Sequence, residues 1–440
     1  MFEKEEENLK NYKKTFDTAS VPLDELDNAI SAGYQRAKDT KIRKPRKKKW
    51  ITSAALVAVI LIAFVTSVRV SPVFAQYVTS IPGMEKIVEL IRDDKGMMSA
   101  VKNDYYQEIG VTAEQKDLKV TIDGAIADTN GLVLFYTLET EEAQERISIE
   151  QVELKSASGE LLEIATMEYG VPHGSENGEK SYSGMVKYFF EEPYDSREFT
   201  IDLMVRGDTV NGEFSIPFKL NEQLQDKVTY KMNETVSIQG QKITFKQANV
   251  YPTRIAVHLK MDPSNTKKIL AFEDLRLVDE NGETWSKIKN GVTGTSISEN
   301  EKIVYLQSNY FRKAEELTLV LSRLQAVDKD KSELLIDLEK GKILRQPEGN
   351  KLRKLRVSGN TVKMELHTKK PFNSFIFGAI HDANGNKIES RSGFSEASGP
   401  SSGVTNIGFN MKGTDIASPI SVGLFSYPSW ITEKVEVKIK

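Results

Sequence analysis

The spacing of apolar residues changes once along this 440-residue chain. Before about residue 110 the apolar positions recur every three or four residues, which predicts amphipathic helices. From about residue 117 they alternate with polar positions, as in LKVTIDGAIADTNGLVLFYTLE, and alternation predicts strands with one buried face. We therefore predict a mainly β protein with a helical N-terminal part.

A long uncharged stretch, WITSAALVAVILIAFVTSV, occupies residues 50–68. At about 1.5 Å per residue, the run from Ile51 to Val68 spans about 27 Å as a helix, close to the hydrocarbon core of about 30 Å. Arg69 alone follows it, whereas a basic run precedes it: Lys41, Arg43, Lys44, Arg46, Lys47, Lys48 and Lys49. Because the more basic side stays in the cytoplasm, we predict a single transmembrane helix in the cell membrane, with the large C-terminal portion extracellular.

A cleaved signal peptide is the alternative interpretation of this stretch. Residues 73–75 read VFA before Gln76, which is the usual spacing of a cleavage site. However, the 49 residues that precede the apolar run are far more than a signal peptide carries. We favour an uncleaved anchor and leave open whether the chain is cut near residue 75.

The formal net charge of −3 conceals an imbalance between the two sides of the predicted span. Residues 1–49 hold 13 Lys and Arg against 9 Asp and Glu, a net of +4, and the remainder holds 47 and 54, a net of −7. The basic run sets topology and attracts anionic lipid. We therefore expect the membrane as a partner and no nucleic acid.

The cytoplasmic stub, residues 1–49, carries an amphipathic pattern. From Pro22 onward, four apolar residues repeat at helical spacing: Leu23, Leu26, Ile30 and Tyr34. A stub of this size cannot bury much of its own surface, so we expect this helix face to lie in a groove of a partner protein. The alternatives are two stub helices packed on each other, or a disordered tail.

A helical neck is predicted over residues 72–110. Its apolar positions keep a helical spacing, with a break at Gly96 and a C-cap at Gly110. Beyond it, related patterns recur: residues 117–139 are echoed by 240–262, and both run strand, polar turn, strand. The hairpin glycines Gly159, Gly282 and Gly385 lie 123 and then 103 residues apart.

The repeats predict three β-modules, over residues 111–222, 223–346 and 347–440. Short strands with frequent turn signals at this size fit tandem immunoglobulin-like β-sandwiches, with barrels as the alternative. The order of strands within each module does not follow from the sequence.

No catalytic constellation is found in the chain, and we expect no enzyme, no cofactor and no metal. HExxH and the phosphate-binding GxxxxGK motif are missing, and SGPSSGVT at 398–405 contains glycines but is not predicted to follow a strand and open a helix. The cysteine count is zero, and the four histidines stand apart from one another. Segments such as Asp128–Asn130 and HDANGN at 381–386 resemble parts of calcium loops, but Asp-Xaa-Asn-Gly is foremost a hairpin turn.

These residues together resemble a known family. The stretch from Trp50 to about Glu139, with VPLDELDNAISAGYQRAK before it, resembles the membrane-linked domain of unknown function of Gram-positive anti-sigma-factor-like proteins. Its motifs are SPVFAQYVTSIPGMEKIVELI, DKGMMSAVKNDYYQEIG and the strand pair that ends in LVLFYTLE. The unit at about 225–345 is similar to a second domain of unknown function that often follows the first.

The resemblance implies a single-pass regulator whose stub holds an extracytoplasmic-function sigma factor, while the outer domains sense or stabilise. Zinc-containing anti-sigma domains carry a His and a Cys pair, which this stub lacks, so the helix face would act alone. The alternative is a surface-anchored binding or structural protein without a sigma partner. In either case the extracellular ligand stays unknown.

Overall fold

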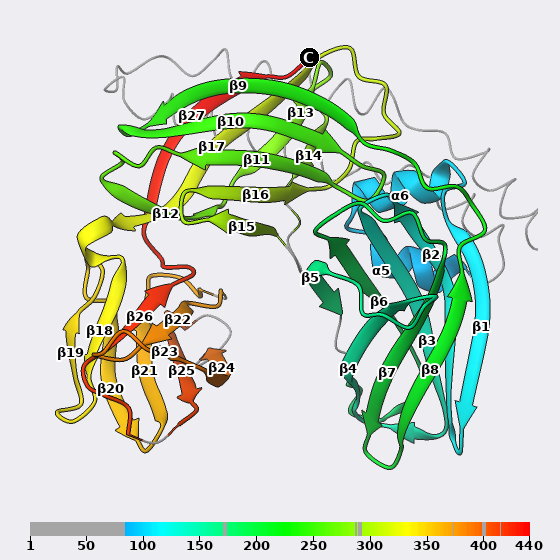
Figure 1. Cartoon of the computed structure of the whole chain (residues 1–440), viewed down its shortest axis with the longest axis horizontal. Coiled ribbons are helices and arrows are strands. Elements are labelled where there is room, and N and C mark those ends of the chain that lie inside the picture. The colour runs from blue at the N-terminus through cyan, green and yellow to red at the C-terminus, as the bar shows by residue number, and fades with distance from the viewer. Residues whose placement is uncertain are drawn as a thin grey trace, which may run out of the picture. The chain divides into compact units, whose positions relative to one another are not determined.

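The computed structural model describes residues 84–169, 174–286, 288, 293–372, 374–397, 402–413 and 415–440 (Figure 1). The chain divides into two compact units, residues 1–75 and 76–440, and all described residues belong to the second. Among them, no helix is long and apolar enough to cross a membrane. The predicted span at 50–68 and the stub lie outside the described residues.

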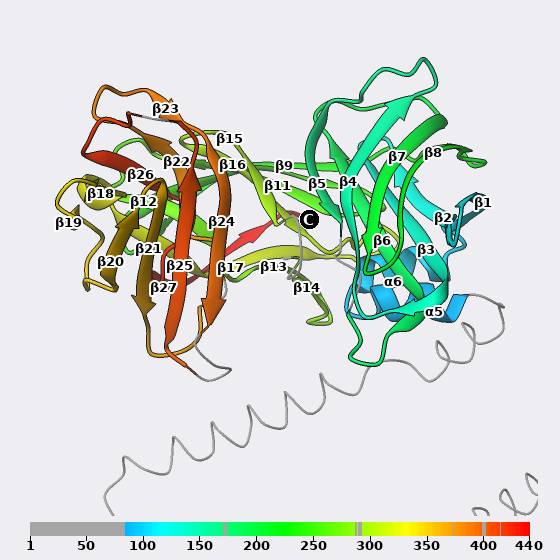
Figure 2. The ribbon, with the colours of Figure 1, turned by 90° about the horizontal axis from the view of Figure 1, so that it is seen from below.

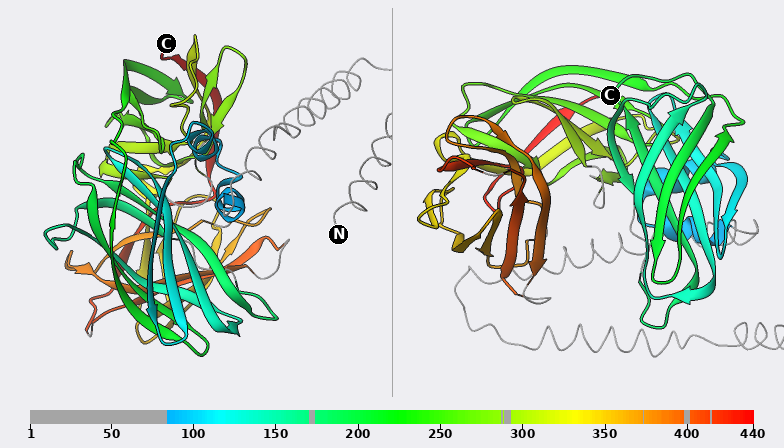
Figure 3. Two further views of the ribbon diagram at one scale, coloured as in Figure 1. Left: turned by 90° about the vertical axis from the view of Figure 1, so that its right-hand side faces the viewer. Right: turned by 60° about the horizontal axis from the view of Figure 1, so that its bottom comes forward.

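Two short helices open the described chain, α5 (Met84–Ile91) and α6 (Lys95–Lys102), which Figure 3 (left) shows end on in blue. Helix α5 buries Met84, Ile87 and Ile91 along one face. Asp94 caps α6, since its carboxylate accepts hydrogen bonds from the backbone N–H of Gly96 at 2.9 Å and of Met97 at 3.1 Å. A capping carboxylate satisfies amides that the first helical turn leaves free.

The helical neck is shorter than the sequence pattern predicts. Helix α6 ends at Lys102, and strand β1 (Gln107–Gln115) already runs through Gly110, which we expected to be a helix C-cap. Gly110 has a φ of 67° where the β1–β2 register shifts between Glu108 and Val111. The glycine therefore permits a bulge within a strand. The predicted boundary at residue 111 is wrong for this reason.

The first module packs two antiparallel sheets over one apolar core. One sheet has the order β1-β2-β3-β6-β5 and the other the order β4-β7-β8. Residues of both sheets, such as Val120, Tyr136 and Leu203, share a single buried cluster. The remaining strands are β2 (Leu118–Asp128), β3 (Gly131–Gln144), β4 (Ile147–Ser156), β5 (Ile164–Tyr169), β6 (Glu179–Phe190), β7 (Glu198–Gly207) and β8 (Asn211–Lys219).

The second module has the same two-layer construction (Figure 1). One sheet runs β15-β16-β11-β10-β9 and the other β12-β17-β13-β14, and β27 pairs with β17 in addition. Its strands are β9 (Val228–Ile238), β10 (Gln241–Val250), β11 (Ile255–Met261), β12 (Lys267–Phe272), β13 (Leu275–Asp279), β14 (Thr284–Ser286), β15 (Gly294–Ser298), β16 (Glu301–Leu306), β17 (Leu317–Asp328) and β27 (Trp430–Lys438).

The third module is built from the orders β19-β18-β26-β22-β23 and β20-β21-β25-β24, and Figure 2 shows β21, β25 and β24 side by side. A short 3-10 helix (Lys329–Lys331) leads into it. Its strands are β18 (Glu333–Asp337), β19 (Lys342–Arg345), β20 (Leu352–Ser358), β21 (Thr361–His367), β22 (Phe377–His381), β23 (Lys387–Ile388), β24 (Ser390–Ala397), β25 (Val404–Met411) and β26 (Ile420–Leu424).

The third module is inserted into the second, which the sequence pattern did not predict. Strand β27 pairs antiparallel with β17, for example Leu319 with Val437, and Ile431 and Val437 complete the core of the second module. Strands β18 and β19, placed before residue 346 by the pattern, pair within the third module. The predicted boundary at 346 is wrong because alternation marks a strand but not its partner.

The mainly β class predicted from the sequence is confirmed. The likeness to immunoglobulin domains extends only to size and the two-layer construction. In a constant-type immunoglobulin domain the first, second, fifth and fourth strands form one sheet. Here the first module places its first three strands side by side.

Candidate functional site

The residues proposed from sequence for partner binding, Leu23, Leu26, Ile30 and Tyr34, lie outside the described residues, as does the basic run. Within the described part of the chain, no group of three or more His, Asp or Glu side chains is placed to hold a metal ion. His367 accompanies Glu365, with Nε2 2.8 Å from its carboxylate, while His258 and His381 stand on β11 and β22. The described histidines are therefore not brought together.

Three Asp-Xaa-Asn-Gly segments form turns in which the aspartate accepts backbone N–H groups. Asp128 accepts from Asn130 at 2.9 Å, Asp279 from Asn281 at 2.9 Å, and Asp382 from the amide of residue 384 at 2.9 Å. Such bonds are typical of Asx-turns. One oxygen of each carboxylate is thus bound to the protein's own backbone, which favours the turn interpretation over a calcium loop.

The turn at Asp128 differs from the other two because it is buried against the second module. Asp128 is 0% exposed, and its second oxygen accepts hydrogen bonds from the backbone N–H and the hydroxyl of Thr253 at 3.0 and 2.6 Å. Asn130 donates its side-chain amide to the carbonyl of Phe190 at 2.9 Å. The turn therefore joins β6 of its own module to the loop before β11.

Arg254 occupies the centre of this contact and is 1% exposed. Its guanidinium donates to the side-chain oxygen of Asn130 at 2.8 Å. It also lies over the rings of Phe189, Tyr251 and Tyr305, with centroid distances of 3.9, 5.0 and 4.9 Å. A desolvated cation over aromatic faces is stabilised by about 2 kcal/mol or more. We call Asp128, Asn130, Phe189, Thr253 and Arg254 the arginine joint.

The electrostatics of the arginine joint are set by burial. Burial raises the pKa of the Asp128 carboxyl above 3.8, while Arg254 and the hydrogen bonds from Thr253 and Asn130 oppose that shift. The Nε of Arg254 has no hydrogen-bond partner. The guanidinium of arginine is planar and always charged, so it can stack on aromatic rings and donate hydrogen bonds at the same time. The ammonium group of lysine cannot do both.

Gly131 permits the close approach of the two modules. A Cβ at this position would lie 2.7 Å from Nη1 of Arg254 and 2.7 Å from the hydroxyl of Thr253. Both distances are shorter than any ordinary carbon contact. The glycine of this turn therefore serves the contact between modules as well as the hairpin.

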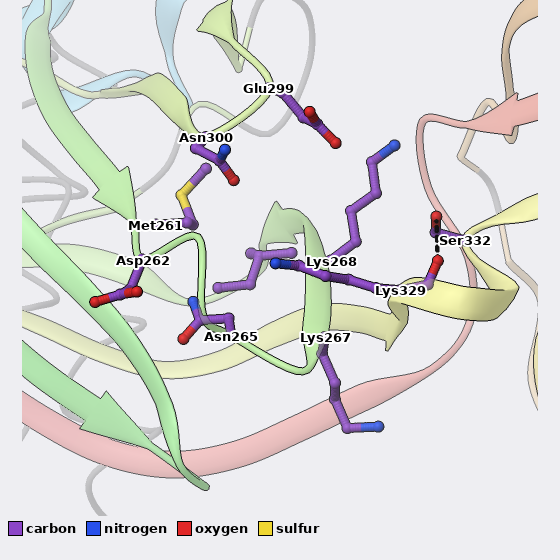
Figure 4. A pocket seen from close by; sticks show the side chains of 10 residues that line it. Met261, Asp262, Asn265, Lys267, Lys268, Glu299, Asn300, Lys329 and Ser332 are labelled. Atoms are coloured by element: carbon purple, nitrogen blue, oxygen red, sulfur yellow. Dashed lines mark hydrogen bonds between the residues drawn. The ribbon is translucent and has the colours of Figure 1, made fainter.

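A small cavity of about 110 Å³ lies elsewhere in the second module (Figure 4). Lysines 267, 268 and 329 line it together with Asp262 and Glu299. Lys267 is paired with Asp328 at 2.5 Å, and Lys329 donates to the carbonyl of Pro263 at 2.6 Å. Because Lys267 and Lys329 are already bound, the cavity offers little to a ligand, and we base no site on it.

Sequence reasoning missed the arginine joint. The sequence predicts a turn at Asp128 and Asn130, but Thr253 and Arg254 stand in the segment YPTR, which carries no motif and lies more than 120 positions further along the chain. The only signal in the sequence is a difference between the two repeats. The turn of the first repeat contains Asn-Gly, whereas the corresponding turn of the second, YPTR, has no glycine. Nothing in the spacing could show that the two segments meet.

The fold thus defines a chain of two-layer β-modules, and two parts of the chain match known protein families. Residues 45–140 match a family model described as a domain of unknown function (DUF4179), and residues 227–345 match one described as a family of unknown function (DUF5643). These matches confirm the predicted tandem of two domains of unknown function. Neither match covers half of the chain.

No curated protein matches the chain. Among solved structures it is similar to the crystal structure of the conserved domain protein from Bacillus anthracis. The two are 16% identical, the likeness covers 55% of this chain and 84% of that chain, and the TM-score is 0.35. A likeness at this level carries no argument about function.

Proposed function

We propose that this protein is a single-pass membrane regulator of the anti-sigma-factor type. Its stub binds a sigma factor in the cytoplasm through Leu23, Leu26, Ile30 and Tyr34, and its β-modules act outside the cell. The observation that carries the proposal is the extent of the first family match. It runs without interruption from the basic run at residue 45, through the apolar stretch, to β3 at residue 140.

The described helices support a link between span and modules. Helix α5 begins at Met84, 15 residues after Arg69, and packs its buried face against the first module, where Lys86 donates to the hydroxyl of Ser181 at 3.1 Å. An anchor that served only as a tether would need no packed helices between membrane and module. The neck is therefore suited to pass a change outside the cell toward the membrane.

Orientation is tested first. Because the chain has no cysteine, single cysteines at Ser20 and at the exposed Ala157 can be labelled on intact cells with a membrane-impermeant maleimide. We expect Ala157→Cys to be labelled on intact cells and Ser20→Cys only after the cells are broken. Labelling of both on intact cells, or of neither, would contradict the topology.

Partner binding is tested with matched variants of the stub. The double variant Leu26→Asp with Ile30→Asp places charge on the predicted apolar face. The control, Glu25→Ala with Asn28→Ala, makes the same number of substitutions on the opposite face. We expect the wild type and the second variant to retain a purified sigma factor in co-purification, and the first variant to lose it. Equal recovery with all three, or with none, would sink the proposal.

A second candidate function, a surface-anchored binding protein, is favoured by one observation. Phe375 and Phe425 are 51% and 65% exposed on the third module and are joined through the backbone, since Phe425 N–H donates to the carbonyl of Ile376 at 2.8 Å. Replacing residues 1–40 by an unrelated tail separates the two candidates. It abolishes a regulator's function and leaves that of a surface binder intact.

A further inference from the structure

Helix α6 contacts the second module as well as the first. The side-chain amide of Gln307 donates to the carbonyl of Asp93, immediately before the helix, at 2.8 Å. Lys95 donates to the carbonyl of Thr284 at 3.1 Å. The helix pair that precedes β1 is therefore bound to segments that lie about 190 and 214 positions further along the chain.

Gly96 brings α6 as close to the second module as a backbone permits. A Cβ on Gly96 would lie 2.4 Å from the backbone nitrogen of Ser308 and 2.9 Å from its Cβ. Beside this contact, the rings of Tyr105 and Phe311 lie 5.3 Å apart. Any larger residue at 96 would push the helix away from the 307–311 loop.

The contact at Ser308 and the arginine joint are physically connected. The buried Ser308 hydroxyl donates to the carbonyl of Tyr251 at 2.5 Å. Tyr251 in turn lies beside the Arg254 guanidinium, and its N–H donates to the Arg254 carbonyl at 2.8 Å. One short loop of the second module, residues 251–254, thus joins α6 to the 128–131 turn.

We propose that α6, the 128–131 turn and the 251–254 and 305–311 segments form one latch, which opens as a unit and releases α6 while the β-modules stay folded. Only the regulatory role of the latch rests on the proposed function, because release of α6 would then alter the segment that leads to the membrane. The occupant of the latch is the chain itself.

The energetics favour opening of the latch before the modules unfold. Each module is held by a large apolar cluster, whereas the latch is held by a few hydrogen bonds, one buried cation and the small cluster around Phe189 and Tyr305. Polar contacts between domains resemble transient interfaces. Regions with few buried apolar contacts open at lower free energy than core strands.

Hydrogen exchange on the full chain in detergent micelles tests the latch. Arg254→Ala removes the cation, and Gly131→Ala inserts a Cβ on the first module without touching α6. We expect either variant to raise the exchange rate of the α6 amides roughly tenfold or more, while β2, β3, β10 and β11 keep their wild-type protection. Gly96→Ala should likewise raise the exchange rate of the amides in the 251–254 loop.

Two matched variants control for the substitutions themselves. Arg276→Ala removes an arginine of the second module that pairs with Asp274 away from the latch. Gly378→Ala adds a Cβ at an ordinary 3.4 Å contact with the carbonyl of Gly423. Neither should change exchange in α6.

The outcomes decide the proposal in each case. Wild-type exchange in α6 of both Arg254→Ala and Gly131→Ala would show that α6 is not coupled to the joint. Loss of protection in β10 and β11 together with α6, in these variants and in the milder Arg254→Lys, would show that no separate latch exists. Either result overturns the inference.

A distance measurement gives a second readout. Spin labels on cysteines at the exposed Ala157 and Glu234 report on the first and second modules, and the chain has no other cysteine. We expect a narrower distance distribution in the wild type than in Arg254→Ala. These results do not depend on a sigma factor or on orientation, so failure of the latch and failure of the proposed function are distinguishable.

Discussion

The first and second modules are joined in a different way from the second and third. Between the first two, the chain passes once, through residues 220–227, and buried polar groups complete the contact. Between the last two, the chain passes twice, because the third module is inserted between β17 and β27.

The second connection combines apolar packing with one buried hydrogen bond and a tryptophan beside two cations. Leu270 and Val327 from strands of the second module belong to the core of the third. The buried Gln325 accepts from the N–H of Tyr427 at 2.9 Å, and Trp430 lies between Arg323 and Lys351 at 4.5 and 5.9 Å. Two covalent passages by themselves restrict the orientation of the third module relative to the second. Specific side-chain contacts are therefore needed most between the first and second modules, where the chain passes only once.

The largest effect is expected from breaking the strand that returns to the second module. Val437→Asp places an unpaired charge at a 0% exposed position of β27 and should lower the free energy of unfolding by about 4 kcal/mol. Urea denaturation followed by fluorescence measures it. Glu436→Ala, an exposed neighbour paired with Lys434, should change little; equal loss in both would contradict the role of β27.

The arginine joint should be weakened somewhat less. Arg254→Ala leaves Asp128 buried without its cation and Asn130 without a donor, at a cost of about 3 kcal/mol to the joint. Calorimetry should then resolve separate transitions for the first and second modules. Arg254→Lys keeps the charge and should cost less. A single unchanged transition in Arg254→Ala would contradict the comparison.

The three turns offer a finer test of the same contrast. Asp128→Ala removes acceptors from buried donors of Thr253 and should cost about 2 kcal/mol. Asp382→Ala removes the same type of Asx-turn bond at an exposed site, where water replaces it, and should cost less. Chemical denaturation of the two variants, each against wild type, gives the difference. A larger loss in Asp382→Ala would reverse the interpretation.

The smallest expected effects are the pH slopes of the two connections. Burial raises the pKa of Asp128 above 3.8, so the folded joint holds its proton more tightly and its stability falls as pH rises through the window above 3.8. Burial lowers the pKa of Lys351 below 10.5, so the stability of its surroundings rises as pH approaches 10.5. Thermal unfolding at a series of pH values gives the difference in stability between wild type and Asp128→Asn, and between wild type and Lys351→Met. The two differences should change with pH in opposite directions; a change of the same sign would be inconsistent with the two pKa shifts.

Local features of the fold could be predicted from the chain alone. Alternation around Asp128–Gly131 located β2 and β3, and the Asp-Xaa-Asn-Gly segments were assigned to turns, where the structure also places them. Such features depend on neighbours in sequence, which is why a short segment contains their cause. The extension of helix α6 to Gly110 failed because Ile109 and Val111 fit either a helix or a strand over so short a run.

Contacts between distant segments needed the tertiary structure. The sequence by itself determined the mainly β class, the turns and the tandem of domains, since each depends on spacing within a few dozen residues. Only the tertiary structure decided that β27 completes the second module and that Arg254 meets the turn at Asp128. Strand partners and buried ions are selected by packing across more than a hundred residues, and residue spacing carries no information about which surfaces meet.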